Sequence, residues 1–259
     1  MICVRSTRRF RRSRFRESVT RRISLPGPGA RGSYDNVLIL GANGQLARNT
    51  TRIFLKDTEA HLTLYLRRAS RLTNPDPKRV TIVEGDVLDA ATLQKAMRGQ
   101  DVVYANLAGD MARQASVIVD AMHVAGVKRL ILISSMGIYR EVPGEAYCSV
   151  LDPYRDSAAL IEQSDIDYTI LRPGWFTHAA EGPCQITQKG EPFRGHDIAL
   201  DSLSALITRI ATTPGLYVRA SIGVSDGQQT SPKKRKETHE KSYRGNRSRF
   251  HRPGHRATA

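Results

Sequence analysis

The stretch of sequence that decides the fold is NVLILGANGQLA, residues 36–47. Its first five residues form a compact apolar run, which is typical of a buried β-strand. Two glycines, Gly41 and Gly44, follow directly. The side chains that then recur on one helical face are Leu46, Thr50, Ile53 and Phe54. The spacing predicts a strand, a tight turn and an α-helix.

The same alternation of short apolar runs and helical patterns continues along the chain. Further strands are predicted at 61–66, 80–83, 101–105, 129–135 and 168–173, with helices at 90–98, 111–125 and 154–163. This rhythm indicates the α/β class with a doubly wound, Rossmann-type parallel sheet in strand order 3-2-1-4-5-6. A small C-terminal cap is expected at about 174–198, then a helix at 201–212 and a last strand at 216–222.

Charge divides the chain into three parts. The net charge of the 259 residues is +15, but residues 1–32 carry +9 and residues 233–259 carry +8, which leaves −2 for residues 33–232. A basic extension at 1–33 and a basic tail at 227–259, both disordered, are therefore expected to flank one domain at 34–226. Nucleic-acid binding is the least favoured of the functions considered, because the domain has no cluster of basic residues that could contact phosphates.

The two basic ends leave several interpretations open. The first segment is rich in Arg and Ser, as organelle transit peptides are, but an extension without function fits it as well. Residues 232–236, PKKRK, resemble a nuclear-import string that also arises by chance. No apolar run reaches the roughly 18 residues of a membrane helix, and Cys3, Cys148 and Cys184 have neither disulfide nor metal spacing. A cytoplasmic protein without a metal is expected.

The turn after the first strand predicts a dinucleotide cofactor. Gly41 permits a tight turn, Gly44 allows close approach of a diphosphate, and the start of the helix offers free N–H groups to the phosphates. The residues expected to bind this part of the cofactor are Gly41, Ala42, Asn43, Gly44, Gln45 and Leu46. Similar turns occur without a ligand, but here the turn lies between a clear strand and a clear helix.

The end of the second strand indicates which cofactor is preferred. An Asp or Glu there binds the ribose 2′-hydroxyl of NAD, whereas this chain has Arg67 and Arg68. A guanidinium pairs with a 2′-phosphate, so NADP(H) is expected in preference to NAD(H). After the third strand, Asp86 and Val87 are expected beside the adenine, although Asp86 also suits a helix cap.

Five segments resemble the NmrA-like, NAD(P)H-binding branch (flavin reductase-like members included) of the atypical short-chain dehydrogenase/reductase superfamily. They are GANGQLA at 41–47, GDVLD at 85–89, NLAG at 106–109, LILISSMGIY at 130–139 and DYTILRPGWF at 167–176. The resemblance covers residues 35–225 and neither end. It implies that Asn106, Leu107 and Ala108 line the cofactor groove, that Ser134 and Ser135 lie beside the nicotinamide, and that Pro173 closes over it.

The chain departs from this family at the catalytic pair. Active members carry Tyr-x-x-x-Lys after the fifth strand, where the Lys lowers the pKa of the Tyr. Here Tyr147 is followed by Leu151 and Tyr154 by Ala158, and no Lys occurs between Lys128 and Lys189. Ser135 and Tyr154 remain as candidate catalytic residues, with packing as the alternative role for Tyr154.

Two functions therefore stay open. One is an NADP(H)-dependent oxidoreductase that transfers a hydride to a planar small molecule of flavin or quinone type, with Trp175, Phe176 and His178 in the cap over the site. The other is a non-catalytic NADP(H)-binding redox sensor. A cofactor that is bound but never oxidised would favour the sensor.

Overall fold

The computed structural model describes residues 34–226. The expectations for the extension at 1–33 and for the tail at 227–259, including the import string at 232–236, lie outside the described residues. Between residues 34 and 226 the chain forms ten β-strands and five α-helices, which alternate through most of its length.

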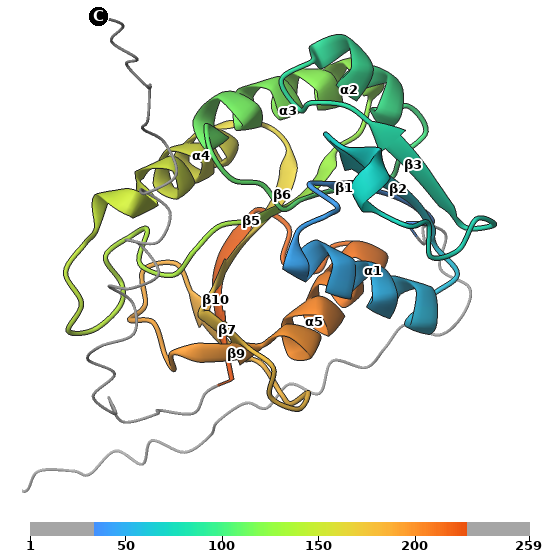
Figure 1. The fold of residues 1–259 in the computed structure, drawn as a ribbon. Coiled ribbons are helices and arrows are strands. Elements are labelled where there is room, and N and C mark those ends of the chain that lie inside the picture. The colour runs from blue at the N-terminus through green and yellow to red at the C-terminus, as the bar shows by residue number, and fades with distance from the viewer. Residues whose placement is uncertain (1–33, 227–259) are drawn as a thin grey trace, which may run out of the picture. The chain divides into compact units, whose positions relative to one another are not determined.

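A mostly parallel sheet forms the centre of this part (Figure 1). In spatial order its strands are β3 (Val80–Glu84), β2 (His61–Leu66), β1 (Asn36–Leu40), β4 (Val102–Ala105), β5 (Arg129–Ile133), β6 (Asp167–Pro173), β10 (Ala220–Ser225) and β8 (Gln185–Gln188). The predicted order 3-2-1-4-5-6 is confirmed. Because the strands from β3 to β6 run parallel, their carboxyl ends meet at one edge of the sheet.

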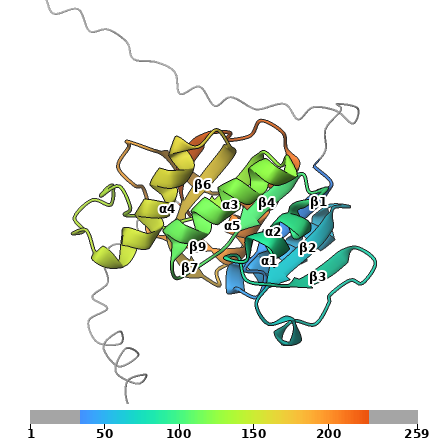
Figure 2. The same cartoon turned by 90° about the horizontal axis from the view of Figure 1, so that it is seen from above.

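Helices cover both faces of the sheet (Figures 1 and 2). They are α1 (Gln45–Asp57), α2 (Ala90–Met97), α3 (Met111–Ala125), α4 (Asp152–Gln163) and α5 (Leu200–Thr212). Alternate residues of β1 belong to two separate cores. Val37 and Ile39 pack with α1 and α5 in one core, and Leu38 and Leu40 pack with α2, α3 and α4 in the other. This strand is buried on both faces, which is why its sequence is continuously apolar.

Local signals fix the ends of several helices. The Asp89 carboxylate accepts a hydrogen bond of 3.2 Å from the Thr92 amide and so caps the start of α2. Asp110 caps α3 in the same way through the Arg113 amide. Gly126 ends α3 in the left-handed conformation, with φ +75°, where a residue without Cβ is favoured.

The last part of the domain differs from the sequence prediction. The strand expected at 216–222 begins only at Ala220, because Tyr217 and Arg219 have positive φ angles and form a turn instead. The strand expected at 129–135 ends at Ile133, so both serines lie beyond its carboxyl end. In the segment 174–198, β8 pairs antiparallel with β10 and extends the main sheet, while β7 (Trp175–Thr177) pairs with β9 (Asp197–Ala199).

Candidate cofactor and acceptor site

The turn between β1 and α1 is held against the end of β2. Gly41 has φ +74°, and its amide donates a hydrogen bond of 3.0 Å to the Tyr65 carbonyl. The Ala42 amide donates to the same carbonyl at 3.3 Å, and the Gly44 amide closes the turn on the Gly41 carbonyl at 3.0 Å. The turn therefore lies at the carboxyl edge of the sheet, bonded to a residue that precedes Arg67 by two positions in the chain.

The first amides of α1 face this edge without an internal partner. The first backbone bond of the helix runs from the Arg48 amide to the Gly44 carbonyl, at 2.9 Å, and no side chain caps Gly44. The amides of Gln45 and Leu46 precede that bond, so they remain as donors. Leu46 and Ala42 are both buried, so neither side chain is exposed to a ligand at this edge. Open amides and the positive end of a helix suit an anion such as a diphosphate.

Both glycines of the turn pack against Asn106, at the end of β4. A Cβ added to Gly41 would lie 2.1 Å from the Asn106 carbonyl oxygen and 3.3 Å from the Leu107 side chain. A Cβ added to Gly44 would lie 2.6 Å from Asn106 Nδ2. The structure thus explains Gly44 by this close side-chain approach. The segment that carries Asn106, Leu107 and Ala108 therefore lies directly beside the turn.

Several buried polar atoms at this edge have no hydrogen-bond partner among the described residues. They include Asn43 Oδ1, in the turn itself, and Ser134 Oγ, just past the end of β5. Buried polar atoms are normally hydrogen-bonded, and orphaned ones point to a missing ligand or water. Open amides, a glycine cradle and these two atoms together fit a dinucleotide along the edge.

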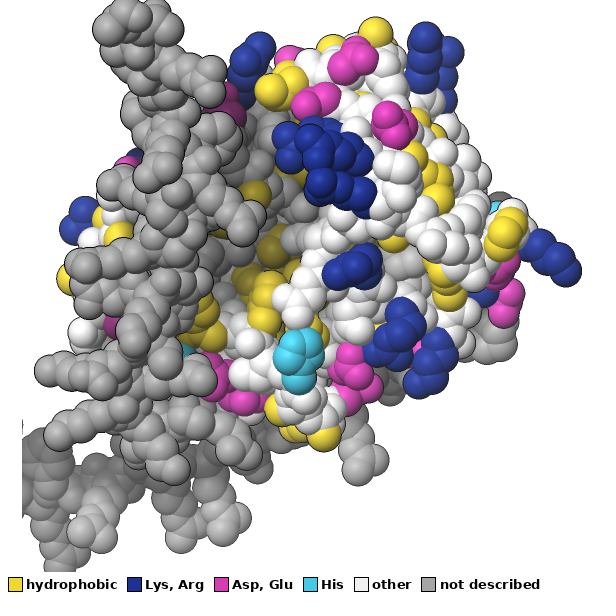
Figure 3. All heavy atoms as spheres, in the orientation of Figure 1, with side chains coloured by type: hydrophobic (Ala, Val, Ile, Leu, Met, Phe, Trp, Pro, Cys, Tyr) yellow, Lys and Arg dark blue, Asp and Glu magenta, His cyan; other side chains and the backbone are white. Residues whose placement is uncertain are grey.

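Arg67 and Arg68 follow β2 directly and are exposed. Their guanidinium groups have no hydrogen bond or ion pair within residues 34–226. The nearby Glu84 carboxylate is engaged instead with the Ala69 amide, at 2.7 Å. Figure 3 shows Lys and Arg side chains beside an apolar hollow on this face. Two unpaired cations are therefore available to an anionic group at the end of β2.

The residues expected at the adenine are placed less favourably. Asp86 Oδ1 accepts a hydrogen bond of 2.9 Å from the Leu88 amide, so this carboxylate stabilises the turn that leads into α2. Val87 is buried in the core and exposes little surface to a ligand. The Tyr65 hydroxyl donates to the Asp86 carbonyl at 2.9 Å, and burial raises the pKa of this phenol to about 12.

A pocket of about 220 Å³ lies at the same edge of the sheet, beyond the carboxyl ends of β5 and β6. Ser135, Pro173 and Trp175 contribute to its wall, and Trp175 is 57% exposed. The Met136 amide donates to the Pro173 carbonyl at 3.2 Å and holds the ends of β5 and β6 together. Mainly apolar side chains line the pocket, which suits a flat organic molecule.

The candidate tyrosines have different surroundings. Tyr154 packs against the core of α3 and α4 and does not line the pocket. Tyr147, which has Leu151 in place of the Lys of the family pattern, does line it. Its hydroxyl donates to Asp152 at 2.7 Å and accepts from Arg155 at 3.0 Å. Partial desolvation and the Asp152 carboxylate raise the pKa of Tyr147 above its usual value. No periodic signal in the loop 136–151 indicates that Tyr147 would face the pocket.

The segment after β7 reaches back to the first helix. His178 Nε2 lies 3.3 Å from Gln45 Nε2, so this segment meets the start of α1. No cluster of His, Cys, Asp or Glu suited to a metal ion occurs between residues 34 and 226. Within the same range no helix is both long enough and apolar enough to cross a bilayer.

Comparison with known proteins agrees with this geometry. The family model described as NAD(P)H-binding matches residues 41–214. A Rossmann-fold NAD(P)-binding family protein from Shigella flexneri is 39% identical, with a TM-score of 0.66, over 76% of this chain and 98% of that one. A short-chain dehydrogenase/reductase from Veillonella parvula, solved in complex with NADP, is 26% identical, with a TM-score of 0.69, over 75% and 97% of the two chains.

The chain therefore belongs to the NAD(P)H-binding family, and the resemblance stated from the motifs is confirmed. Among curated proteins, quinone oxidoreductase 2 of Escherichia coli is 25% identical over 145 residues, which are 54% of this chain and 49% of that protein. The chain spans about half the length of the curated relatives it matches.

Proposed function

We propose that the chain binds NADP(H) in preference to NAD(H) and reduces a flat small molecule of quinone or flavin type. The observation that carries the proposal is the unpaired, exposed Arg67 and Arg68 pair, two residues after the Tyr65 carbonyl that holds the diphosphate-binding turn. A 2′-phosphate carries up to two negative charges, and a guanidinium pairs with it in bidentate fashion.

The side chains of this protein bind and orient, and they supply little acid–base chemistry. The amides of Gln45 and Leu46 would hold the diphosphate, and Ser135 would donate a hydrogen bond to an acceptor carbonyl. When bound, NADPH supplies a hydride, and one proton from water completes the two-electron, two-proton reduction of a quinone to a hydroquinone. The Tyr147 hydroxyl donates its proton to a hydrogen bond with Asp152, and its pKa is raised further above neutrality by desolvation and by that carboxylate.

A nucleotide titration tests the cofactor part. The full-length chain and the variant Arg67→Glu/Arg68→Glu are titrated with NADPH and NADH. The matched control is Arg98→Glu/Arg209→Glu, which makes the same change in net charge at exposed arginines away from this edge. We expect the reversal at 67 and 68 to raise the Kd for NADPH by about tenfold or more, since charge-assisted hydrogen bonds contribute roughly 1.5–3 kcal/mol. The Kd for NADH should change little.

Equal affinity of the wild type for both nucleotides would contradict the cofactor proposal. Steady-state oxidation of NADPH with quinone and flavin acceptors then tests the reaction. Tight binding of NADPH without oxidation by any acceptor would favour the redox sensor instead.

A further inference from the structure

One arginine on the rim of the acceptor pocket has no acidic partner. Arg140 lines the pocket and is exposed, and its guanidinium carbon lies 5.0 Å from the centre of the Tyr147 ring. No carboxylate of the described residues lies within ion-pair distance of it. Arg155, whose guanidinium carbon lies 5.7 Å from the centre of the same ring, is by contrast paired with Asp152 and Asp156.

The backbone at Arg140 is strained. Its φ angle is +61°, in the left-handed region that costs an L-residue roughly 1–2 kcal/mol. The Arg140 amide donates to the Gly137 carbonyl at 3.0 Å and so closes a tight turn. Strained residues of this kind cluster at ligand sites, where the surrounding structure holds them in place.

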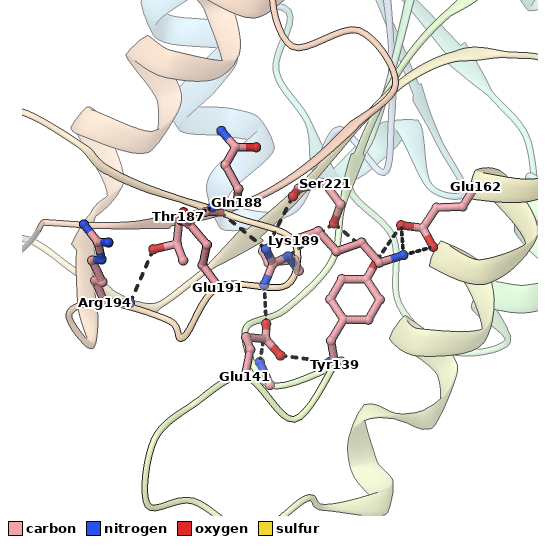
Figure 4. A network of polar contacts seen from close by, with 11 residues as sticks. Tyr139, Glu141, Glu162, Thr187, Gln188, Lys189, Glu191, Arg194 and Ser221 are labelled. Carbon is pink, nitrogen blue, oxygen red and sulfur yellow. Dashed lines mark hydrogen bonds and ion pairs between the residues drawn. The ribbon is translucent and has the colours of Figure 1, made fainter. Parts of the chain in front are cut away.

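A buried ion pair holds this turn. The carboxylate of Glu141 pairs with Arg172, which lies on β6 and is fully buried. Glu141 also accepts hydrogen bonds from the Gly137 amide at 3.1 Å and from the Tyr139 amide at 2.8 Å (Figure 4). The residue next to Arg140 is thus anchored to the central sheet, and the position of Arg140 on the rim is fixed.

The neighbouring charges beneath this turn are already neutralised. The Tyr139 hydroxyl donates to Glu162 at 2.8 Å, and Lys189 pairs with the same carboxylate at 2.7 Å (Figure 4). Glu145 also lines the pocket and is exposed, and it is not paired with Arg140. Arg140 is therefore the cation of the described pocket wall that is left for a ligand.

We infer that Arg140 recognises an anionic group on the acceptor, and that the acceptor is a compact aromatic carbonyl compound carrying a carboxylate, sulfonate or phosphate. This inference rests on the proposed reduction at the same pocket. The pocket volume of about 220 Å³ lies below the roughly 300–1,000 Å³ of common ligand pockets, which favours one or two fused rings. Trp175 lines the pocket and is exposed, and its ring, which already stacks with that of His196, brings an aromatic surface to the pocket.

A binding experiment tests the inference without any turnover. Trp175 is the single tryptophan of the chain, so quenching of its fluorescence reports on this pocket. The probes are 4-nitrobenzoate and the neutral, nearly isosteric 4-nitrobenzamide, both of which quench indole emission. In the wild type we expect the benzoate to bind about tenfold more tightly than the amide, as a charge-assisted contact predicts.

Three variants locate the effect. Arg140→Asn removes the charge and keeps a residue that tolerates the left-handed backbone, so it should raise the Kd for the benzoate by about tenfold and leave that for the amide unchanged. Arg140→Lys keeps the charge and should stay within about threefold of the wild type. Glu145→Gln removes a negative charge that repels the benzoate from the pocket rim, and it should lower the Kd for the benzoate. Arg98→Asn is the control away from the pocket.

Equal binding of the two probes to the wild type, or an equal loss of both in Arg140→Asn, would overturn the inference. Its failure is distinguishable from that of the reductase proposal by NADPH oxidation with 1,4-naphthoquinone-2-sulfonate and uncharged 2-methyl-1,4-naphthoquinone. If both quinones are reduced and Arg140→Asn leaves both rates unchanged, the inferred role of Arg140 is contradicted and the reductase proposal stands. If the charged probe binds more tightly but neither quinone oxidises NADPH, the role of Arg140 stands and the reductase proposal is contradicted.

Discussion

The Tyr65 hydroxyl donates a hydrogen bond of 2.9 Å to the Asp86 carbonyl oxygen and so ties the end of β2 to the residues that follow β3. The Tyr65 side chain is fully buried, and its ring occupies the space in which any side chain at Gly85 would lie. This bond joins the segment that carries Arg67 to the one that carries Asp86. The Gly85 amide, which donates to the Leu66 carbonyl at 3.0 Å, joins the same two segments.

The phenol of Tyr65 predicts a dependence of stability on alkaline pH. Its pKa is raised from 10.0 to about 12, mainly by burial, so the folded protein holds this proton more tightly than the unfolded chain does. The resulting stabilisation is fully present below pH 10 and is lost as the pH rises toward 12. In urea titrations we expect the unfolding free energy of the wild type to fall more steeply over this range than that of Tyr65→Phe. Parallel curves would contradict this prediction. At pH 7 the variant should be less stable by about 1–2 kcal/mol, because the hydrogen bond is lost.

Gly41 should be more sensitive to substitution than a glycine of the same backbone conformation elsewhere. Gly41 and Gly99 have φ angles of +74° and +73°, but only at Gly41 would a Cβ meet another atom, the Asn106 carbonyl oxygen at 2.1 Å. Gly99→Ala should cost roughly 1–2 kcal/mol from backbone strain alone. Gly41→Ala should cost about 1–3 kcal/mol more, from the overpacked contact. Chemical denaturation measures both, and equal losses would show that the contact relaxes freely.

The buried pair of Glu141 and Arg172 should be strongly coupled. Arg172→Met leaves the Glu141 carboxylate buried without its cation, which is expected to cost about 3–5 kcal/mol. Glu141→Gln in the same chain removes the stranded charge, so the double variant should be more stable than the sum of the single losses predicts. Denaturation of the wild type, both single variants and the double variant measures the coupling. Additive losses would mean that the two side chains act independently.

Ser135 and Tyr154 should differ in their effect on catalysis. Ser135 lines the acceptor pocket, so Ser135→Ala should lower kcat for NADPH oxidation by about tenfold, the value of one hydrogen bond to a developing charge at the low end of such effects. Tyr154 packs against the core away from this pocket, and Tyr154→Phe should keep kcat within about twofold. A reversed order of the two effects would place the chemistry on the side of α4 instead.

Sequence periodicity was sufficient to predict most of the central sheet. The strands β1, β3, β4 and β5 are each a short apolar run followed by a helical pattern, and such local rhythm specifies parallel pairing when the crossover helices must cover both faces. The turn at Gly41 was equally readable, since its φ of +74° is one that glycine favours. The last strand was misplaced because Leu216 and Tyr217 are apolar yet belong to a turn that packs against the core.

By itself, the amino-acid sequence determined the parallel α/β sheet, the glycine turn after the first strand and the placement of two arginines after the second strand. These features arise from neighbouring residues, whose conformational preferences and spacing act locally. Only the tertiary structure decided that Arg140, Tyr147 and Trp175 meet at one pocket and that Glu141 is buried against Arg172. These contacts join irregular loops to distant strands, and packing rather than any repeating pattern brings them together.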